Sequence, residues 1–233
     1  MTLLEQSAAF VRYVDELMSN LPSAKWSDVI TNPERTAIFA IDLINGFCYE
    51  GNLASPRIAA VVPAVARLFA QAYARGVRDF VLIQEWHHEQ AEEFNAFPAH
   101  GVRETSEART VKELASLPFA WQYTVLRKNS VDPVIDTGLS AWLDAHPLDA
   151  AIVTGDCTDI CAYLLALHLR TRANAGNRKL RVIVPADCVQ TYDLPVETAR
   201  QIGALAHDGN FLHTLFLYHM ALHKIEVVKA IEA

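Results

Sequence analysis

The chain has 233 residues, of which 52% are hydrophobic and 20% are charged, and its formal net charge is -7. These proportions are typical of a globular protein and exclude a fibrous or largely disordered one, while four cysteines are too few for a disulfide scaffold of this length. The acidic balance argues against nucleic acid as a partner, because that binding depends on clustered Lys and Arg.

Residues 1–34 predict a helical extension ahead of the main domain. Between residues 3 and 18, apolar side chains recur at helical spacing and form one stripe. The opposite face is not basic, so we expect this helix to dock on the main domain or on another subunit and not on a membrane. The first residues lack the features of a secretion signal, and no apolar run is long enough to cross a bilayer, so we expect a cytoplasmic location.

Residues 35–233 alternate between strand and helix patterns. Strands are predicted at 36–41, 77–84, 122–126, 150–153, 180–185 and 225–230, and helices at 58–74, 107–117, 139–145, 162–170 and 196–220. This alternation predicts one α/β domain, a three-layer α-β-α fold with a six-stranded, mainly parallel, Rossmann-like sheet. Ligands of such a sheet bind beyond the carboxyl ends of its strands. No Gly-rich dinucleotide or phosphate loop is present, so a nucleotide cofactor is not indicated.

Cys161 is a candidate nucleophile because it lies where a buried strand turns into a helix. Apolar residues 150–153 are followed by Gly155 and Asp156, and helical spacing begins near Ala162. Unpaired amide groups and the helix dipole at a helix N-terminus stabilise a thiolate, so we expect a lowered pKa for this thiol. The alternative is a buried cysteine that acts only as a small hydrophobic residue.

Asp42 and Lys128 follow two other predicted strands. Carboxyl ends of parallel strands meet at one edge of the sheet, so these side chains can converge with Cys161. A carboxylate there can accept the thiol proton and return it to a leaving amine, while an ammonium group stabilises both anions. Such a trio suits acyl transfer. The alternatives are that Asp42 caps the following loop and that Lys128 is a solvated strand end.

Three motifs resemble those of the isochorismatase-like cysteine hydrolases, and most closely the nicotinamidases. IFAIDLINGFCYEGNLASP resembles the first-strand motif of that family, in which Asp42, Asn45, Phe47, Gly51 and Leu53 match, while Ile44 and Gly46 depart from the usual Gln and Asp. VLRKNSVDPVIDTGLSAW resembles the segment with the family's lysine, and VTGDCTDICAYLLAL resembles its nucleophile turn. The resemblance runs from residue 36 to the C-terminus and leaves the predicted N-terminal helix uncovered.

The resemblance implies roles for the trio and for one neighbouring residue. Cys161 is expected as the nucleophile, Asp42 as the proton shuttle and Lys128 as their electrostatic partner. A cis peptide bond is implied between Asp156 and Cys157, and the backbone amides of Cys157 and Cys161 are implied as the oxyanion hole. Cys157 departs from the small residue usual at its position, and a disulfide or two-cysteine metal site with Cys161 stays open as an alternative. Cys48 and Cys188 are interpreted as structural.

The loop QEWHHEQAEEFNAFPAHG resembles the metal-binding loop of nicotinamidases. Glu85, His87 and His100 match its ligand positions, with Glu85 in place of the family's Asp, and Glu93 is the expected additional ligand. Two imidazoles with carboxylates suit a divalent ion, with zinc expected and manganese or iron as alternatives. Without the resemblance, an exposed polar loop that binds nothing would be the favoured interpretation.

The resemblance also implies aromatic contacts with a substrate and a specific reaction. Phe47 and Trp86 match positions that pack against the ring of nicotinamide, although either could be ordinary core. The expected protein is therefore a cysteine amidohydrolase, a nicotinamidase, which acts on a small-molecule amide and assembles as a homo-oligomer. Two alternatives are a related hydrolase of another small amide or ureido acid, and a catalytically silent scaffold of the same fold.

Overall fold

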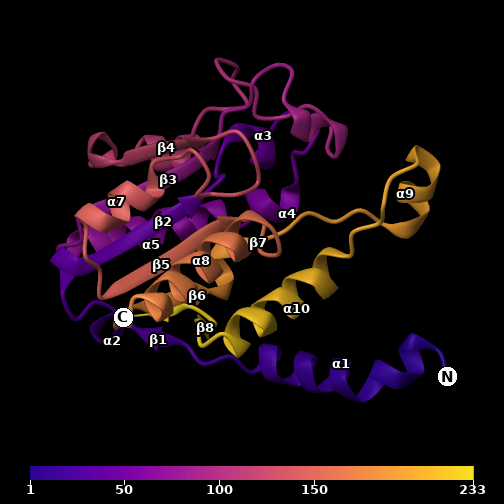
Figure 1. Cartoon of the computed structure of the whole chain (residues 1–233), viewed down its shortest axis with the longest axis horizontal. Helices are drawn as coiled ribbons and strands as arrows, with labels where there is room; N and C mark the ends of the chain where they lie inside the picture. Colours follow the sequence, from indigo (N-terminus) through magenta and orange to yellow (C-terminus); the bar gives the residue numbers. More distant parts are fainter. Residues whose placement is uncertain (233) are drawn as a thin grey trace.

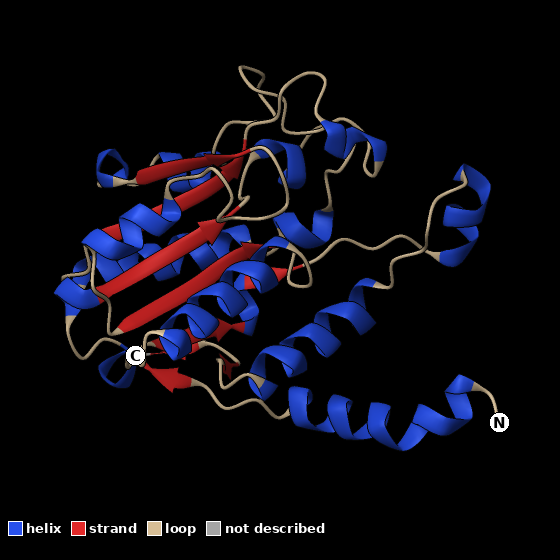
Figure 2. Ribbon diagram, in the orientation of Figure 1, coloured by secondary structure: helices blue, strands red, loops and turns tan. Residues whose placement is uncertain are grey.

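A parallel β-sheet forms the centre of the fold in a computed structural model that describes residues 1–232 (Figures 1 and 2). Its strands run in the order β4-β3-β2-β5-β6-β8, and β7 pairs with the end of β5. Their bounds are β2 Thr36–Ile41, β3 Asp79–Glu85, β4 Thr124–Lys128, β5 Ala150–Asp156, β6 Arg181–Pro185, β7 Val189–Gln190 and β8 Glu226–Val228. The predicted α/β class and all six predicted strands are confirmed. The seventh strand, β7, was not predicted, because two residues carry no alternation.

Helices cover both faces of this sheet, as Figure 2 shows. One face packs against α3 Asn45–Cys48, α4 Pro56–Ala59, α5 Val62–Ala74 and α6 Lys112–Ala115. The other packs against α7 Leu139–Ala145, α8 Cys161–Ala175 and α10 Gly209–Leu222. Short 3-10 turns occupy Pro33–Arg35, Glu92–Asn95, Ala120–Gln122 and Ala186–Cys188. The three-layer architecture therefore has a separate apolar core on each side of the sheet.

Two predicted helices differ from the observed ones. The segment 107–117 is helical only in the single turn of α6, and 196–220 is divided into α9 Val196–Ile202 and α10. Gly203 has a φ of 71°, a left-handed conformation that ends α9. In Figure 1, α9 stands away from the sheet on an arm of the chain.

Both ends of the chain pack against the body of the protein. Helix α1 Leu3–Ser19 lies along α10, where Phe10 and Tyr13 make edge-to-face contacts with Tyr218, with ring centroids 5.5 and 6.1 Å apart (Figure 1). After α1 come β1 Ala24–Lys25 and α2 Trp26–Val29, and β1 pairs in parallel with β9 Ile231–Glu232. The expected docking of the first helix on the main domain is thus observed, whereas the domain boundary at residue 34 stays a prediction.

Strand β5 approaches β2 closely at the edge where ligands are expected. Gly155 has a φ of 107°, and a Cβ at this position would collide with the carbonyl oxygen of Ile41. Only glycine allows this approach, which places Asp156 beside Asp42 at the ends of neighbouring strands. Within residues 1–232, no helix combines the length and the apolar character that a membrane crossing requires.

Candidate active site

The carboxyl edge of the sheet gathers the three predicted catalytic residues. Asp42 directly follows β2, Lys128 ends β4, and Cys161 begins α8 after the turn that follows β5. All three are at least 95% buried. The parallel sheet explains the arrangement, since residues far apart in sequence meet where its strands end.

The Lys128 ammonium group connects the members of this cluster. Its Nζ lies 2.9 Å from Oδ2 of Asp42, 2.8 Å from Oε1 of Glu85 and 3.7 Å from Sγ of Cys161. It also donates to the carbonyl oxygen of Ser130 at 3.2 Å. Burial acts to lower the pKa of Lys128, but the charges of Asp42, Cys161 and Glu85 raise it well above its usual value. Lys128 is therefore a fixed cation between two carboxylates and the thiol.

The thiol of Cys161 is protonated in this environment, contrary to the expected lowered pKa. Burial raises its pKa well above the ordinary value, Lys128 acts to lower it, and Asp42 and Glu85 raise it further. The dipole of α8 and the nearby ammonium do not overcome desolvation and two negative charges. Burial also raises the pKa of Asp42 to about 6, against the opposing effect of Lys128. The resting pair is therefore a thiol beside a carboxylate that can accept its proton.

The turn between β5 and α8 leaves two backbone donors available. The peptide bond between Asp156 and Cys157 is cis, as the resemblance implied. The N–H groups of Thr158 and Ala162 donate to backbone carbonyls, whereas no hydrogen bond is found for the N–H of Cys157 or Cys161 within residues 1–232. Two free N–H groups beside a nucleophile are what an oxyanion hole requires.

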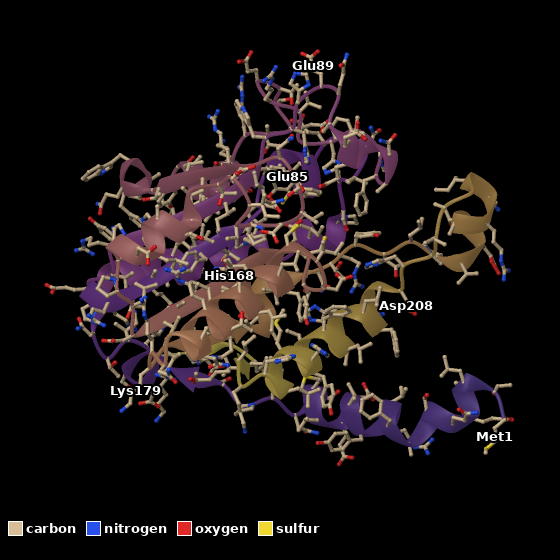
Figure 3. All side chains as sticks on the ribbon, viewed as in Figure 1. Met1, Glu85, Glu89, His168, Lys179 and Asp208 are labelled. Atoms are coloured by element: carbon tan, nitrogen blue, oxygen red, sulfur yellow. The ribbon has the colours of Figure 1, made fainter. Side chains whose placement is uncertain are left out.

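Four side chains predicted to bind a metal converge next to Lys128. They are Glu85, His87, Glu93 and His100, and one possible ligand atom from each lies within 4.8 Å of the others. Oε2 of Glu85 lies 2.7 Å from Nε2 of His100 and 3.2 Å from Nε2 of His87, and Oε1 of Glu93 lies 3.7 Å from the latter. In Figure 3, Glu85 lies inside the fold while Glu89, in the following loop, reaches its outer edge. The loop thus turns its ligand residues inward.

The donor set fits a divalent cation. The Nδ1 atom of His100 lies 2.7 Å from the carbonyl oxygen of Pro98, and that of His87 lies 3.3 Å from Oδ1 of Asn129. These acceptors hold the protons on Nδ1, so that both Nε2 atoms face the cluster with a lone pair. Oε2 of Glu85, Nε2 of His87 and Oε1 of Glu93 are buried without a hydrogen-bond partner among the described residues. Unpaired buried ligand atoms that converge are typical of a metal centre.

Glu85 joins this cluster to the Lys128 cluster. One carboxylate oxygen faces Lys128 and the other faces the two histidines. Burial acts to raise the pKa of Glu85, but Lys128 and the neighbouring His100 and His87 hold it well below its usual value. The longer Glu side chain, which replaces the family's Asp, therefore serves both groups as an anion.

The two predicted aromatic contacts lie in different places. Phe47, at the end of α3, is buried, and its ring centroid lies 5.4 Å from that of His100. Trp86 follows Glu85 and turns to the opposite side of the strand, where the guanidinium of Arg127 lies 3.4 Å from its ring centroid. Phe47 thus borders the cluster, while Trp86 packs against a neighbouring strand.

Two residues of the site were missed in the sequence. Asn129 fixes the ring of His87 and also accepts from the N–H of His88 at 3.0 Å, and its position directly after Lys128 was the available signal. The sequence pattern assigns Asp156 only to the turn, yet its side chain is buried with Oδ1 unpaired among residues 1–232. A carboxylate at the end of a wholly buried strand was the signal there.

Comparisons with known proteins agree with this fold. The profile of the isochorismatase domain matches residues 36–213. Nicotinamidase 1 of Arabidopsis thaliana is 26% identical over 235 residues, covering 93% of this chain and 95% of that protein. An N-carbamoylsarcosine amidase from Thermoplasma acidophilum has a similar fold, with a TM-score of 0.65 and 20% identity over 85% of this chain and 98% of that one. A pyrazinamidase of Pyrococcus horikoshii in complex with zinc also has a TM-score of 0.65, with 20% identity over 84% and 99% of the two chains.

Proposed function

The chain belongs to the isochorismatase family of hydrolases, and on that premise we propose that it is a cysteine amidohydrolase acting as a nicotinamidase, which converts nicotinamide and water to nicotinate and ammonia. The observation that carries the proposal is the contact of one buried ammonium, Lys128, with Asp42, Glu85 and the Cys161 thiol. The likeness to Nicotinamidase 1 over most of both chains supports this substrate.

Acylation of Cys161 is the first half of the proposed reaction. Asp42 accepts the thiol proton as Sγ of Cys161 attacks the carboxamide carbon, and Lys128 offsets the negative charge in both states. The oxyanion of the tetrahedral intermediate accepts hydrogen bonds from the N–H groups of Cys157 and Cys161. The carbon–nitrogen bond then breaks, the Asp42 proton passes to the departing nitrogen, and ammonia leaves a thioester behind.

Hydrolysis of the thioester returns the enzyme to its first state. Asp42, again a carboxylate, removes a proton from a water molecule that attacks the thioester carbon. The carbon–sulfur bond breaks, the proton on Asp42 returns to the Cys161 sulfur, and the nicotinic acid that forms loses its own proton to solvent to give nicotinate. A divalent ion held by Glu85, His87, Glu93 and His100 would supply a Lewis acid for the ring nitrogen of the substrate. We propose zinc as this ion.

Ammonia release from nicotinamide tests the proposal. Protein purified without chelators is assayed with added zinc or manganese, and its metal content is measured by mass spectrometry. We expect turnover that is lost in Cys161→Ala, while Cys188→Ala, which removes a buried thiol elsewhere, keeps it. Absence of ammonia release from nicotinamide would remove the substrate assignment, and full activity of Cys161→Ala would remove the mechanism.

A second candidate is hydrolysis of a ureido acid or of another small amide. The unpaired Asp156 carboxyl favours it, because nicotinamide has only its leaving nitrogen as an N–H donor near the scissile carbonyl. The fold likeness to an N-carbamoylsarcosine amidase is compatible with it. Metal content separates the two candidates: protein that neither contains nor binds zinc, manganese or iron favours the second.

A further inference from the structure

Asp156 places a third carboxyl group next to the proposed oxyanion hole. It is the last residue of β5, it precedes Cys157, and it is 1% exposed. The neighbouring strand is β2, and Asp42, the residue after its end, lies beside Asp156. The mechanism proposed above uses Asp42 and the N–H of Cys157 and leaves Asp156 without a role.

The side chain of Asp156 has no adequate partner. Within residues 1–232, its Oδ1 atom makes no hydrogen bond, and Oδ2 has one contact, with Sγ of Cys157 at 3.9 Å. The buried cation nearby is committed elsewhere, since Lys128 contacts Asp42, Glu85 and Cys161. A buried carboxyl oxygen that is left unpaired is costly and calls for a partner outside the described chain.

The Asp156 side chain projects from the face of the sheet that packs against Phe47. Side chains of a strand alternate between its faces, so Asp156 projects from the same face as Ile152, which belongs to the same apolar core as Phe47 and Cys48. Asp156 therefore lies at the end of β5 beside Cys157, next to the end of β2, and on the face of the sheet that carries Phe47.

We propose that Asp156 gives the enzyme a further activity beside hydrolysis of nicotinamide, on small primary amides that carry an amine or another N–H donor next to the scissile carbonyl, and that within this class it selects for the donor. The inference rests on the proposed amidohydrolase function. Asp156 and Cys157 are consecutive residues, so we expect Oδ1 to meet a donor that lies close to a carbonyl held by the N–H of Cys157. Aliphatic α-amino amides and ureido compounds have this arrangement, and nicotinamide does not.

A matched pair of amides tests the selection. Glycinamide and propionamide have the same heavy-atom skeleton and differ by an ammonium in place of a methyl group. The ratio of their kcat/KM values is measured by ammonia release for the wild type, Asp156→Asn and Asp156→Leu. The difference in intrinsic reactivity between the two amides cancels when this ratio is compared between variants. We expect the ratio to fall about tenfold in Asp156→Asn, which keeps an acceptor oxygen but loses the charge, and about 100-fold in Asp156→Leu.

Asp159→Asn is the control for a general loss of negative charge. Asp159 lies three residues further along the same turn, and its carboxylate is already paired with Nε2 of His207 at 2.8 Å. We expect this variant to keep the wild-type ratio. An equal fall in Asp159→Asn and Asp156→Asn would overturn the inference, because the effect would then come from the overall field and not from a specific contact.

A labelling experiment keeps the inference testable without turnover. 2-Aminoethyl and propyl methanethiosulfonate differ by the same ammonium-for-methyl exchange, and each transfers its alkylthio group to a thiol with release of methanesulfinate. The ratio of their labelling rates at Cys161 is measured by peptide mass spectrometry. We expect this ratio to fall about tenfold in Asp156→Asn and to stay unchanged in Asp159→Asn.

The outcomes separate this inference from the proposed function. Ammonia release by the wild type, with equal ratios in the wild type, Asp156→Asn and Asp156→Leu, overturns the inference and leaves the amidohydrolase function standing. No ammonia from any amide removes the proposed function, and the labelling ratio then decides on Asp156 alone. If Asp156→Leu does not fold by circular dichroism, the isosteric Asp156→Asn decides the result.

Discussion

Asp42 and Asp156 are the same residue type, equally buried, at the ends of neighbouring strands, yet their surroundings differ. Asp42 contacts Lys128 at 2.9 Å and accepts a hydrogen bond from the N–H of Glu85, whereas Asp156 has one weak contact with a thiol. Burial raises the pKa of both groups. For Asp42 the opposing effect of Lys128 exceeds that of Glu85, and the pKa rises only to about 6; for Asp156 the charges of Asp42 and Glu85 exceed the effect of Lys128, and the pKa lies well above its usual value.

This difference separates two uses of a buried carboxyl group. A carboxylate whose pKa lies near neutrality can take and return a proton, which is the work of a general base. A buried carboxyl group with no adequate partner among residues 1–232 is available to a donor on a ligand. One lysine, at the end of β4, contacts Asp42 and not Asp156, and we propose that this contact decides which of the two aspartates acts as the base.

Lys128→Met is expected to have the largest effect, because it removes the feature that distinguishes the two aspartates. Asp42 and Glu85 lose their shared cation while both stay buried, and breaking such a buried ion pair costs about 3–5 kcal/mol of unfolding free energy. Ammonia release should fall at least about 1000-fold, since neither the thiolate nor the carboxylate is then compensated. Urea unfolding and the amide assay measure the two effects.

Lys179→Met is the matched control for that substitution. Lys179 is exposed, so the same exchange should change the unfolding free energy by less than about 0.5 kcal/mol. If Lys128→Met is as stable and as active as this control, Lys128 does not distinguish Asp42 from Asp156.

The convergence of the proposed catalytic residues was predictable from sequence because all three lie at or just after strand ends. Asp42, Lys128 and Cys161 each follow or end an apolar run, and parallel strands end at a common edge. The inward turn of Glu93 was not predictable from spacing. It depends on a hydrogen bond that the N–H of Val131 donates to Oε2 of Glu93, and this bond joins the loop to a segment 38 residues away. Its ligand role came from the family resemblance.

Other features depend on tertiary contacts that leave no mark on sequence. Residues 189–190 form the strand β7 only because they pair with the end of β5. In the same way, β1 is a strand because it pairs with β9. The thiol pKa was expected to be lowered by a helix N-terminus, but the extent of burial and the second carboxylate, Glu85, reverse the direction. Trp86 follows the alternation of β3 away from Glu85, which strand periodicity could have indicated.

His213 of α10 sharpens the comparison, because it is a basic group that contacts the turn between β5 and α8. Its Nδ1 lies 2.9 Å from the hydroxyl of Thr158, and burial together with the charge of Arg57 lowers its pKa to about 4. The unfolded chain binds a proton to this residue near pH 6.5. Between pH 6.5 and 4 the unfolded state thus holds a proton that the folded state lacks, so unfolding free energy is lost as the pH falls.

His213→Gln should remove that part of the acid sensitivity. The fall in unfolding free energy between pH 6.5 and 4 should be smaller than in the wild type by about 2 kcal/mol, a value reduced for the partial exposure of the ring. Urea unfolding at several pH values measures it. His88→Gln, at an exposed histidine, should leave the wild-type pH dependence in place. If the unfolding free energies of His213→Gln and the wild type depended on pH in the same way, burial of His213 would not penalise its charged form.

Asp156→Leu is expected to have the smallest effect on stability and to separate the two aspartates most directly. Replacing a buried carboxyl group that lacks partners with an apolar side chain removes an unsatisfied atom, so the unfolding free energy should stay the same or rise by up to about 1 kcal/mol. Asp42→Leu, the same exchange on the neighbouring strand, should lose about 3 kcal/mol because Lys128 then loses a partner. Urea unfolding of both variants gives the difference. An equal loss in the two would mean that Asp156 has a structural partner in the folded chain, and its carboxyl would then not be free for a ligand.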